Sequence, residues 1–207
     1  SENIVTQENL DSITTAEIAA AFGADMILCN RLDVNDPKIF GLYPGERHLA
    51  AAPKHDGKAS IDRLKKLVGR PVGINLEPIG DHPNMMEQQI AILPGCTASE
   101  AVIKKAEAMG FQFMVLTGNP GTGVTNEAII HSVTVAKQYF SGLIIAGKMH
   151  ASGVDERIMT AETAKDFIEA GADVILAPAV GSVPGFDEAD LTEVVKVVHQ
   201  LGGLVMS

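Results

Sequence analysis

The sequence contains few cysteines and no long apolar run. Its two cysteines, Cys29 and Cys96, lie in unrelated contexts and form no metal-ligand pattern. No segment reaches the length of about 18 apolar residues that a membrane-spanning helix needs. Two scattered cysteines favour a reducing compartment over a disulfide-stabilised scaffold, so we expect a cytoplasmic protein.

Positive charge is also scarce. The chain has 16 Lys and Arg residues against 26 Asp and Glu residues, which gives a formal net charge of -10. Nucleic acid needs a basic footprint, and anionic membrane surfaces attract basic segments. We therefore expect neither nucleic acid nor a membrane as a partner. This balance leaves a small anionic metabolite open, because local donors decide that interaction.

Nucleotide-binding fingerprints are missing as well. No Gly-x-Gly-x-x-Gly follows the first expected strand, and neither glycine-rich segment, 118–125 or 181–185, matches a Walker or Rossmann motif. Both segments precede expected helices, and backbone N–H groups beside a helix N-terminus favour an anion. Gly181 and Ser182 are therefore predicted substrate contacts. A tight turn that needs glycine explains both segments equally well.

One pattern occurs three times in the chain. Each copy ends an amphipathic helix, turns at a glycine and begins an apolar strand, at residues 22–28, 109–116 and 170–176. Glycine reaches the left-handed conformation past a helix end at low cost. A strand that is apolar at every position is typical of a parallel sheet buried on both faces. The pattern therefore predicts a repeated α/β unit.

The repeated unit predicts a parallel sheet with right-handed crossovers. Even recurrence favours a TIM (β/α)8-type barrel over an open doubly wound sheet. A complete barrel usually needs about 250 residues. We therefore expect residues 1–207 to form one incomplete barrel domain that lacks terminal elements. The expected strands, about seven in number, are Ile4–Thr6, Met26–Asn30, Val72–Leu76, Phe113–Thr117, Leu143–Gly147, Val174–Ala177 and Leu204–Met206.

Capping residues mark the expected helix starts. Thr14 and Thr97 each begin a capping-box pattern with a glutamate three residues later. Thr125, Thr160 and Asp187 are the N-caps expected for three further helices.

Long connections follow the second and third expected strands, at 31–58 and 78–96. In parallel α/β folds, long connections at the carboxyl ends of strands usually carry function. Polar residues at the ends of otherwise apolar strands also need a reason, because burying them without partners is costly. The residues expected to converge on one pocket from these strand ends are Asn30, Asn75, Glu77, Thr117 and Asn119.

Lys148 and His150 alternate with Met149, so their side chains are expected to share one side of the strand. A lysine near the barrel axis can form a Schiff base or hold an anion, and the structural alternative is an ion pair with Glu77. His150 can relay protons near neutral pH.

Glu77 can act as a general base or as a metal ligand. With His150, Asp33 or His82 it could assemble a divalent-metal site, but no dense ligand spacing supports one. We therefore predict no resident cofactor and keep a divalent metal as a lesser alternative. The predicted catalytic residues are Lys148, His150 and Glu77, and the predicted substrate contacts are Asn30, Asn75, Thr117, Asn119, Gly181 and Ser182.

Three segments carry a family resemblance: 73–78 (GINLEP), 115–129 with its VLTGNP and GVTNEAI runs, and 145–151 (IAGKMHA). They resemble an uncharacterised bacterial family of TIM-barrel proteins often labelled phosphoenolpyruvate phosphonomutase-like, some of whose members carry a haloacid-dehalogenase-like label. The resemblance covers nearly the whole chain and implies a barrel. The acidic magnesium site and the mobile Lys/Cys-type loop of true phosphonomutases are not found in this sequence.

These observations predict an enzyme that acts on a small anionic metabolite at the carboxyl ends of the strands. A lyase, aldolase or phosphonomutase-like reaction follows only by analogy. The alternative is a barrel that binds a metabolite without turnover, as a sensor or accessory protein. A homo-oligomer is compatible with either function.

Overall fold

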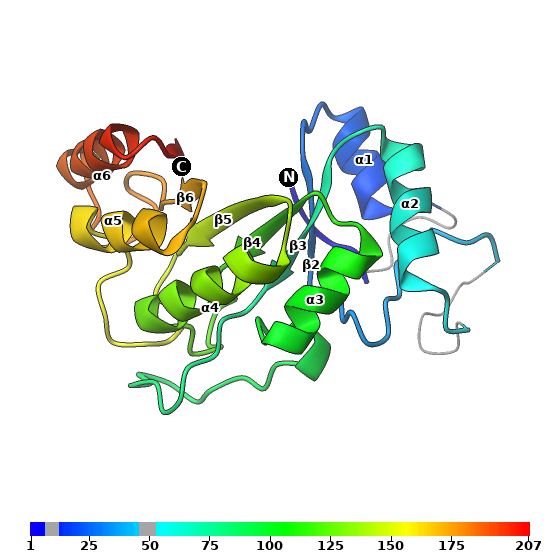
Figure 1. Cartoon of the computed structure of the whole chain (residues 1–207), viewed down its shortest axis with the longest axis horizontal. Coiled ribbons are helices and arrows are strands. Elements are labelled where there is room, and N and C mark those ends of the chain that lie inside the picture. Colours follow the sequence, from blue (N-terminus) through cyan, green and yellow to red (C-terminus); the bar gives the residue numbers. More distant parts are fainter. Residues whose placement is uncertain (7–12, 46–52) are drawn as a thin grey trace.

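The computed structural model describes residues 1–6, 13–45 and 53–207. Its centre is a curled sheet of seven parallel strands that follow one another in chain order (Figure 1). Helices connect successive strands, as a (β/α) barrel requires. The predicted incomplete TIM-type barrel is therefore confirmed. The strands are β1 (Glu2–Ile4), β2 (Ile27–Asn30), β3 (Val72–Leu76), β4 (Phe113–Leu116), β5 (Leu143–Gly147), β6 (Val174–Leu176) and β7 (Leu204–Met206).

The helices start largely where the capping residues predict. Thr14 makes a full capping box with Glu17, and the side chains of Thr125, Thr160 and Asp187 cap their helices. The helices are α1 (Thr15–Ala21), α2 (Gly57–Val68), α3 (Glu100–Met109), α4 (Asn126–Tyr139), α5 (Ala161–Ala170) and α6 (Glu188–Gln200), with a 3-10 turn η2 (Pro94–Cys96).

The capping box expected at Thr97 is wrong. Ser99 is the N-cap of α3 and makes no side-chain cap bond. Thr97 instead pairs with Glu77 in an isolated parallel bridge, and its hydroxyl donates to the Pro94 carbonyl at 3.0 Å. Thr97, which the local pattern assigns to the start of α3, thus makes a tertiary contact beside β3 instead.

Side chains alternate between two cores along each strand. Residues such as Ile74, Met114 and Ile144 pack in the large core between the sheet and the helices. The intervening residues, such as Phe113 and Ile145, form a smaller apolar cluster on the concave face. This alternation identifies which strand-end residues face the barrel interior.

Strand β1 lies two residues earlier than predicted. We expected Ile4–Thr6, whereas the structure has Glu2–Ile4, with Glu2 opposite Leu28 and Ile4 opposite Asn30. Other strand ends shift by no more than one residue from those expected. The corrected register places the Glu2 side chain among the residues at the barrel mouth.

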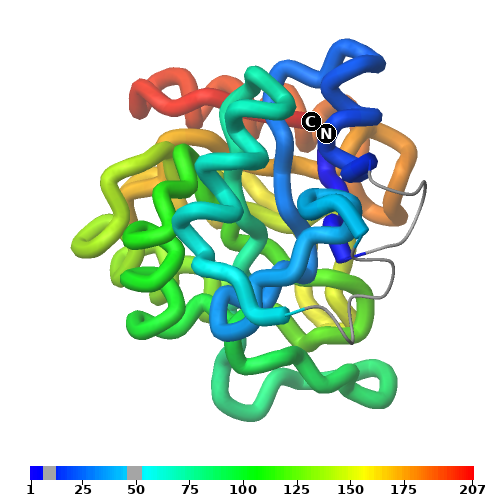
Figure 2. Tube along the Cα trace, turned by 90° about the vertical axis from the view of Figure 1, so that its right-hand side faces the viewer, coloured from blue at the N-terminus to red at the C-terminus, as the bar shows by residue number. Residues whose placement is uncertain are grey.

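The connection between β3 and α3 packs on two neighbouring connections (Figures 1 and 2). The Met86 N–H donates to the Gly153 carbonyl at 2.8 Å, and the Ile90 N–H donates to the Gly121 carbonyl at the same distance. Met85 also pairs with Val154 in an antiparallel bridge. Three connections therefore form one layer at the carboxyl end of the sheet.

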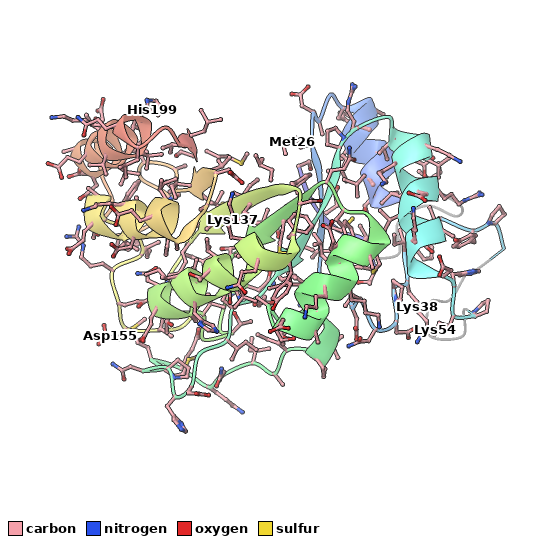
Figure 3. All side chains as sticks on the ribbon, viewed as in Figure 1. Met26, Lys38, Lys54, Lys137, Asp155 and His199 are labelled. Carbon is pink, nitrogen blue, oxygen red and sulfur yellow. The ribbon has the colours of Figure 1, made fainter. Side chains whose placement is uncertain are left out.

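Polar side chains such as Lys137, Asp155 and His199 are exposed on the outside of this framework (Figure 3). None of the helices in the described part of the chain combines the length and the apolar character needed to cross a membrane.

Candidate functional site

Three asparagines from neighbouring strands meet at the carboxyl end of the sheet. Asn30 Oδ1 accepts hydrogen bonds from Asn75 Nδ2 at 3.0 Å and from Asn119 Nδ2 at 3.2 Å. Asn30 Nδ2 donates in return to Asn119 Oδ1 at 2.9 Å. The structure therefore brings together three of the predicted substrate contacts, and we call Asn30, Asn75 and Asn119 the asparagine cluster.

Glu77 extends this cluster with a buried carboxylate. Its side chain is 4% exposed, and its two oxygens accept from Asn119 Nδ2 at 2.8 Å and from the Asn119 N–H at 3.0 Å. Within residues 1–6, 13–45 and 53–207, Glu77 makes no ion pair with a basic side chain. A buried carboxylate that accepts hydrogen bonds but has no cationic partner can still bind a proton, a cation or a further hydrogen-bond donor.

The carboxylate opens onto a pocket of about 390 Å³. Its polar wall holds Glu2, Asn30, Arg31, Glu77 and Asn119. Glu2 is connected to the asparagine cluster, because its carboxylate accepts a hydrogen bond from Asn30 Nδ2. The remaining lining is mostly apolar and comes from Ile4, the connection residues Ile90, Ala91, Ile92 and Leu93, and Cys96, Pro120 and Thr122.

Arg31 is the cation of this pocket, and its backbone is unusual. Its φ is 58°, in the left-handed region that non-glycine residues rarely adopt. Its N–H donates to Asn30 Oδ1 at 2.8 Å, so the asparagine cluster holds this conformation. Costly backbone conformations of this kind concentrate at functional sites.

Cys96 lines the same pocket as an un-ionised thiol. Burial, together with the charges of Asp33 and Glu77, raises the pKa of Cys96 to about 11, against the opposing effect of Arg31. The thiolate is the nucleophilic form of cysteine, so this side chain is not an activated nucleophile near neutral pH.

His150 lies in the connection after β5. Its Nδ1 accepts from the Ser152 N–H at 3.1 Å, which leaves Nε2–H as the donor of the neutral ring. Burial and the nearby charge of Lys148 lower the pKa of His150 below its ordinary value of 6.5, while Glu2 and Glu77 oppose this shift. The imidazole is therefore neutral at pH 7 and lies within electrostatic range of both pocket carboxylates.

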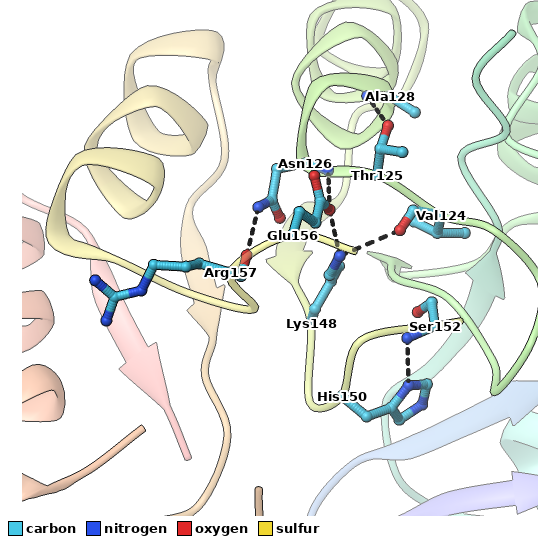
Figure 4. Close-up of polar contacts among 9 residues, drawn as sticks. All are labelled: Val124, Thr125, Asn126, Ala128, Lys148, His150, Ser152, Glu156 and Arg157. Carbon is cyan, nitrogen blue, oxygen red and sulfur yellow. Dashed lines mark hydrogen bonds and ion pairs between the residues drawn. The ribbon is translucent and has the colours of Figure 1, made fainter. Parts of the chain in front are cut away.

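Lys148 is fully buried and pairs with Glu156 (Figure 4). Its Nζ also donates to the Val124 carbonyl at 3.2 Å, and Glu156 accepts from the Asn126 N–H at 2.8 Å. The ion pair therefore joins the β5–α5 connection to the first turn of α4. Burial lowers the pKa of Lys148, whereas Glu156 acts in the opposite direction.

The structural alternative for Lys148, and the position near the barrel axis considered for it, are therefore both wrong. Lys148 does not pair with Glu77, because its ionic partner is Glu156. It also does not lie near the barrel axis. Lys148 continues the series Ile144 and Ala146, which packs against the helices, and its Nζ contacts the carbonyl of another residue of that core.

Thr117, Gly181 and Ser182 do not line the pocket beside Glu77. Thr117 lines a second cavity of about 260 Å³ among apolar side chains of the concave face. The hydroxyl of Ser182 donates to the Ala179 carbonyl at 2.6 Å in an exposed turn, where Gly181 has a φ of 79°. In the described part of the chain, no hydrogen bond joins these residues to the cluster, and their substrate contacts stay predictions.

The described residues contain no group of three or more His, Cys, Asp or Glu side chains arranged to hold a metal ion. Of the alternative ligands named above, Asp33 bonds the Asn35 N–H at 2.7 Å, and His82 lines a different pocket from Glu77. The side chains present thus do not fit a metal held by three such ligands.

Sequence reasoning missed Glu2, Arg31, Glu156 and the apolar residues 90–93. Arg31 directly follows a predicted strand-end asparagine, which is a usable signal. Glu2 was hidden by the misplaced first strand. Glu156 and residues 90–93 lie in connections without periodicity, so only the folded chain shows their role.

The whole chain, residues 1–207, matches the family model described as "Domain of unknown function (DUF7916)", and the chain belongs to that family. A comparison with curated proteins gives no significant match.

Solved structures share the fold at low sequence identity. A putative lyase/mutase from Burkholderia cenocepacia J2315 has a TM-score of 0.51 and 20% identity, over 100% of this chain and 67% of that one. A mandelate racemase/muconate lactonizing enzyme from Jannaschia sp. CCS1 has a TM-score of 0.53 and 11% identity, over 99% of this chain and 46% of that one. A 3,6-anhydro-D-galactonate cycloisomerase from Zobellia galactanivorans has a TM-score of 0.51 and 11% identity, over 92% of this chain and 41% of that one.

This chain thus spans less than half the length of two of these proteins. At these identities the likeness shows the fold alone. It is compatible with the resemblance to phosphonomutase-like barrels, and that finer label stays a prediction.

Proposed function

We propose that this member of the DUF7916 family is an enzyme of lyase or mutase type, which acts on a small anionic metabolite in the pocket lined by Glu77 and Arg31. TIM-barrel enzymes carry their active sites at the carboxyl ends of the strands, where this pocket lies. The putative lyase/mutase that shares the fold suggests the reaction class.

The observation that carries the proposal is the state of Glu77. The residue is 4% exposed, and its carboxylate has no ion pair among the described residues. Burying a charge without a counter-ion costs several kcal/mol. Nothing in the packing of β3 requires a carboxylate there, because the helix-side core is built from the alternate positions Ile74 and Leu76. A costly group beside a cavity is typical of a reactive site.

Each pocket residue has a role that follows from its contacts. Arg31 has a guanidinium that makes no ion pair with the described residues and can bind the anionic group of the substrate, because Arg recognises carboxylates and phosphates through paired N–H donors. Glu77 accepts a proton from the substrate, while Asn119 holds both of its oxygens in place. His150 does not line the pocket; from the connection after β5 its neutral ring can donate a hydrogen bond from Nε2–H to a bound substrate.

Lys148 has a supporting role in this proposal. Its ammonium group is committed to Glu156 and the Val124 carbonyl, so it fixes the connections that carry His150 and Asn119 rather than contacting substrate. A divalent metal supplies no step here, because the described side chains do not provide a three-ligand set for one.

Turnover and binding test the proposal separately. The full chain is incubated with a panel of 2-oxo, 2-hydroxy and phosphorylated acids, with and without Mg²⁺, and products are followed by ¹H and ³¹P NMR. Glu77→Gln should lower kcat by about 10²-fold or more, as expected for a general base, while KM changes little. Glu193→Gln, an exposed carboxylate on α6, is the matched control and should keep full activity.

Two outcomes would contradict the proposal. If a panel acid binds with a dependence on Arg31 but is never converted, the protein is the non-catalytic metabolite-binding barrel. If an acid is converted at an unchanged rate by Glu77→Gln, the reaction occurs without the pocket carboxylate.

A further inference from the structure

Within residues 1–6, 13–45 and 53–207, the lining of the pocket beside Glu77 holds more negative than positive charge. These residues contribute the carboxylates of Glu2 and Glu77, and Arg31 is the single cationic side chain among them. A substrate with only negative groups would place like charges close together in a partly desolvated space, which disfavours binding. The charge balance therefore calls for a positive group on the ligand as well as a negative one.

The acceptors of the pocket also have unused capacity. Each Glu77 oxygen accepts one hydrogen bond from Asn119, and a carboxylate oxygen can accept two. Asn75, which donates to the pocket residue Asn30, is 3% exposed, and its Oδ1 has no hydrogen-bond partner in the described part of the chain. An ammonium group, with three donors and no acceptor, satisfies acceptors of this kind.

Arg31 supplies the complementary half of the site. Its guanidinium makes no ion pair within the described residues, although its strained backbone is held by Asn30. A planar guanidinium is suited to a carboxylate, which it binds through two parallel N–H donors. The pocket thus offers acceptors on Glu2 and Glu77 and a cationic donor on Arg31.

The facing wall is apolar. Ile90 and Leu93 are 54% and 59% exposed, and Ile4 is 42% exposed beside them. The backbone of this wall is fixed, because the Ile90 N–H donates to Gly121 at 2.8 Å. A short apolar chain on the ligand would cover these side chains and gain affinity by removing them from water.

We propose that the ligand of this pocket is a small amino acid: its ammonium group binds Glu77 and Glu2, its carboxylate binds Arg31, and its apolar carbons lie against Ile90 and Leu93. This inference rests on the proposed function for the place of the site, keeps the anionic group that binds Arg31, and adds an ammonium group to the ligand. It requires no metal and no covalent step.

Matched ligands that lack one charge test the inference by calorimetry on the full chain. The first set is L-leucine, 4-methyl-2-oxopentanoate without the ammonium group, and 3-methylbutylamine without the carboxylate. The second set, with a longer charge separation, is 6-aminohexanoate, hexanoate and hexylamine. In at least one set the amino acid should bind tenfold or more tightly than both of its relatives.

Three variants assign the ends of the site. Glu77→Gln should weaken binding of the amino acid tenfold. Binding of the acid without an ammonium group should stay unchanged or become tighter. Glu2→Gln, at the exposed rim of the pocket, should act in the same direction and covers the case in which Glu77→Gln fails to fold. Arg31→Gln should weaken both carboxylate ligands and leave the amine unchanged, and the exposed Lys165→Gln should change nothing.

The failure of this inference is distinguishable from failure of the proposed function. An acid without an ammonium group that binds as tightly as its amino acid and is converted by the protein overturns the zwitterion and supports the proposed function. An acid that binds only with Mg²⁺ assigns the positive charge to a metal and also overturns the zwitterion. Absence of measurable binding for both amino acids at 10 mM, roughly ten-thousandfold above a dissociation constant of about 1 μM, overturns it as well.

Discussion

Asn119 donates twice to Glu77, through its backbone N–H at 3.0 Å and through Nδ2 at 2.8 Å. Asn119, in the connection that follows β4, therefore binds both carboxylate oxygens of Glu77, which follows β3. The same side chain also makes a reciprocal amide pair with Asn30. Position 119 thus controls both the charge and the orientation of the pocket.

Asn119→Asp should destabilise the protein by about 2–4 kcal/mol at pH 7, because it removes the charge-assisted hydrogen bond from Nδ2 to Glu77 and sets two carboxylates side by side. Repulsion raises the pKa of the pair in the folded state above its unfolded value. The pair therefore costs little below the unfolded pKa, and stability is lost as pH rises through the folded pKa. Urea denaturation at pH 4.5 and 7.5 measures this difference. Asn84→Asp, at an exposed site, should show little change, and an equal loss at both pH values would contradict the prediction.

The two halves of the Lys148–Glu156 pair should respond unequally to substitution. Glu156→Gln leaves a fully buried ammonium group without a counter-ion and should cost about 3–5 kcal/mol. Lys148→Met leaves a carboxylate whose side chain is 27% exposed and still bonded to the Asn126 N–H, so we expect a loss of about 1–2 kcal/mol. Chemical denaturation at pH 7 compares them, and the reverse order would show that Lys148 is better hydrated than its burial indicates.

His150 should make stability depend on pH in mildly acidic solution. Its folded pKa lies below the ordinary value of 6.5, because burial and Lys148 disfavour the imidazolium. The unfolded chain therefore binds this proton first as pH falls, so stability is complete above about 6.5 and is lost on acidification through the window below it. His150→Asn should flatten this part of the profile, whereas the exposed His199→Asn should not. An imidazole NMR titration midpoint above 6.5 for His150 would contradict the assignment.

Arg31 should reverse the usual order of alanine and glycine. At a φ of 58° a Cβ costs about 1 kcal/mol, so Arg31→Gly should be more stable than Arg31→Ala by about that amount. At the exposed helical position Lys66 in α2, the Lys66→Ala variant should instead have a free energy of unfolding about 1 kcal/mol higher than Lys66→Gly. Thermal denaturation of the four variants measures both differences, and alanine above glycine at position 31 would mean that the left-handed conformation is absent.

Gly73 tests the packing of the concave face. A Cβ at this position would lie 2.3 Å from the Phe113 ring, so Gly73→Ala forces that ring to move. Overpacking of this kind typically costs about 1–3 kcal/mol. Gly181→Ala, where a Cβ meets open space but φ is 79°, serves as a comparison in which backbone strain acts alone. Equal unfolding free energies for Gly73→Ala and the natural chain would show that the face is loosely packed.

Much of the site was predictable because polar residues interrupt strands that are otherwise apolar. The period of two along β2, β3 and β4 places Asn30, Asn75 and Asn119 on one side of the sheet, and parallel pairing brings their ends together. The same period also places Lys148 with Ile144 and Ala146 on the helix side. A charged residue at the end of a strand predicts a functional site, and this prediction conflicts with the period of two for Lys148. Its partner Glu156 lies in a connection with no periodicity.

The misplaced first strand has a different cause. A short apolar run beside Val5 and Thr6 permits several registers, and only pairing of Glu2 with Leu28 selects the observed one. That choice hid the second carboxylate of the pocket. Thr97 was mispredicted for a related reason, because its bridge to Glu77 competes with the local capping pattern.

The three connections that pack together at the mouth of the barrel have a consequence for hydrogen exchange. The amides of Met86, Ile90 and Gly123 donate across connection boundaries, to Gly153, Gly121 and Ser152 respectively. Opening one connection therefore breaks hydrogen bonds that protect amides of a neighbouring connection from exchange. These amides should exchange with solvent as one cooperative unit rather than as three independent loops. A ligand that enters the pocket along residues 90–93 would slow exchange at Gly123, on a connection that these residues join through Ile90.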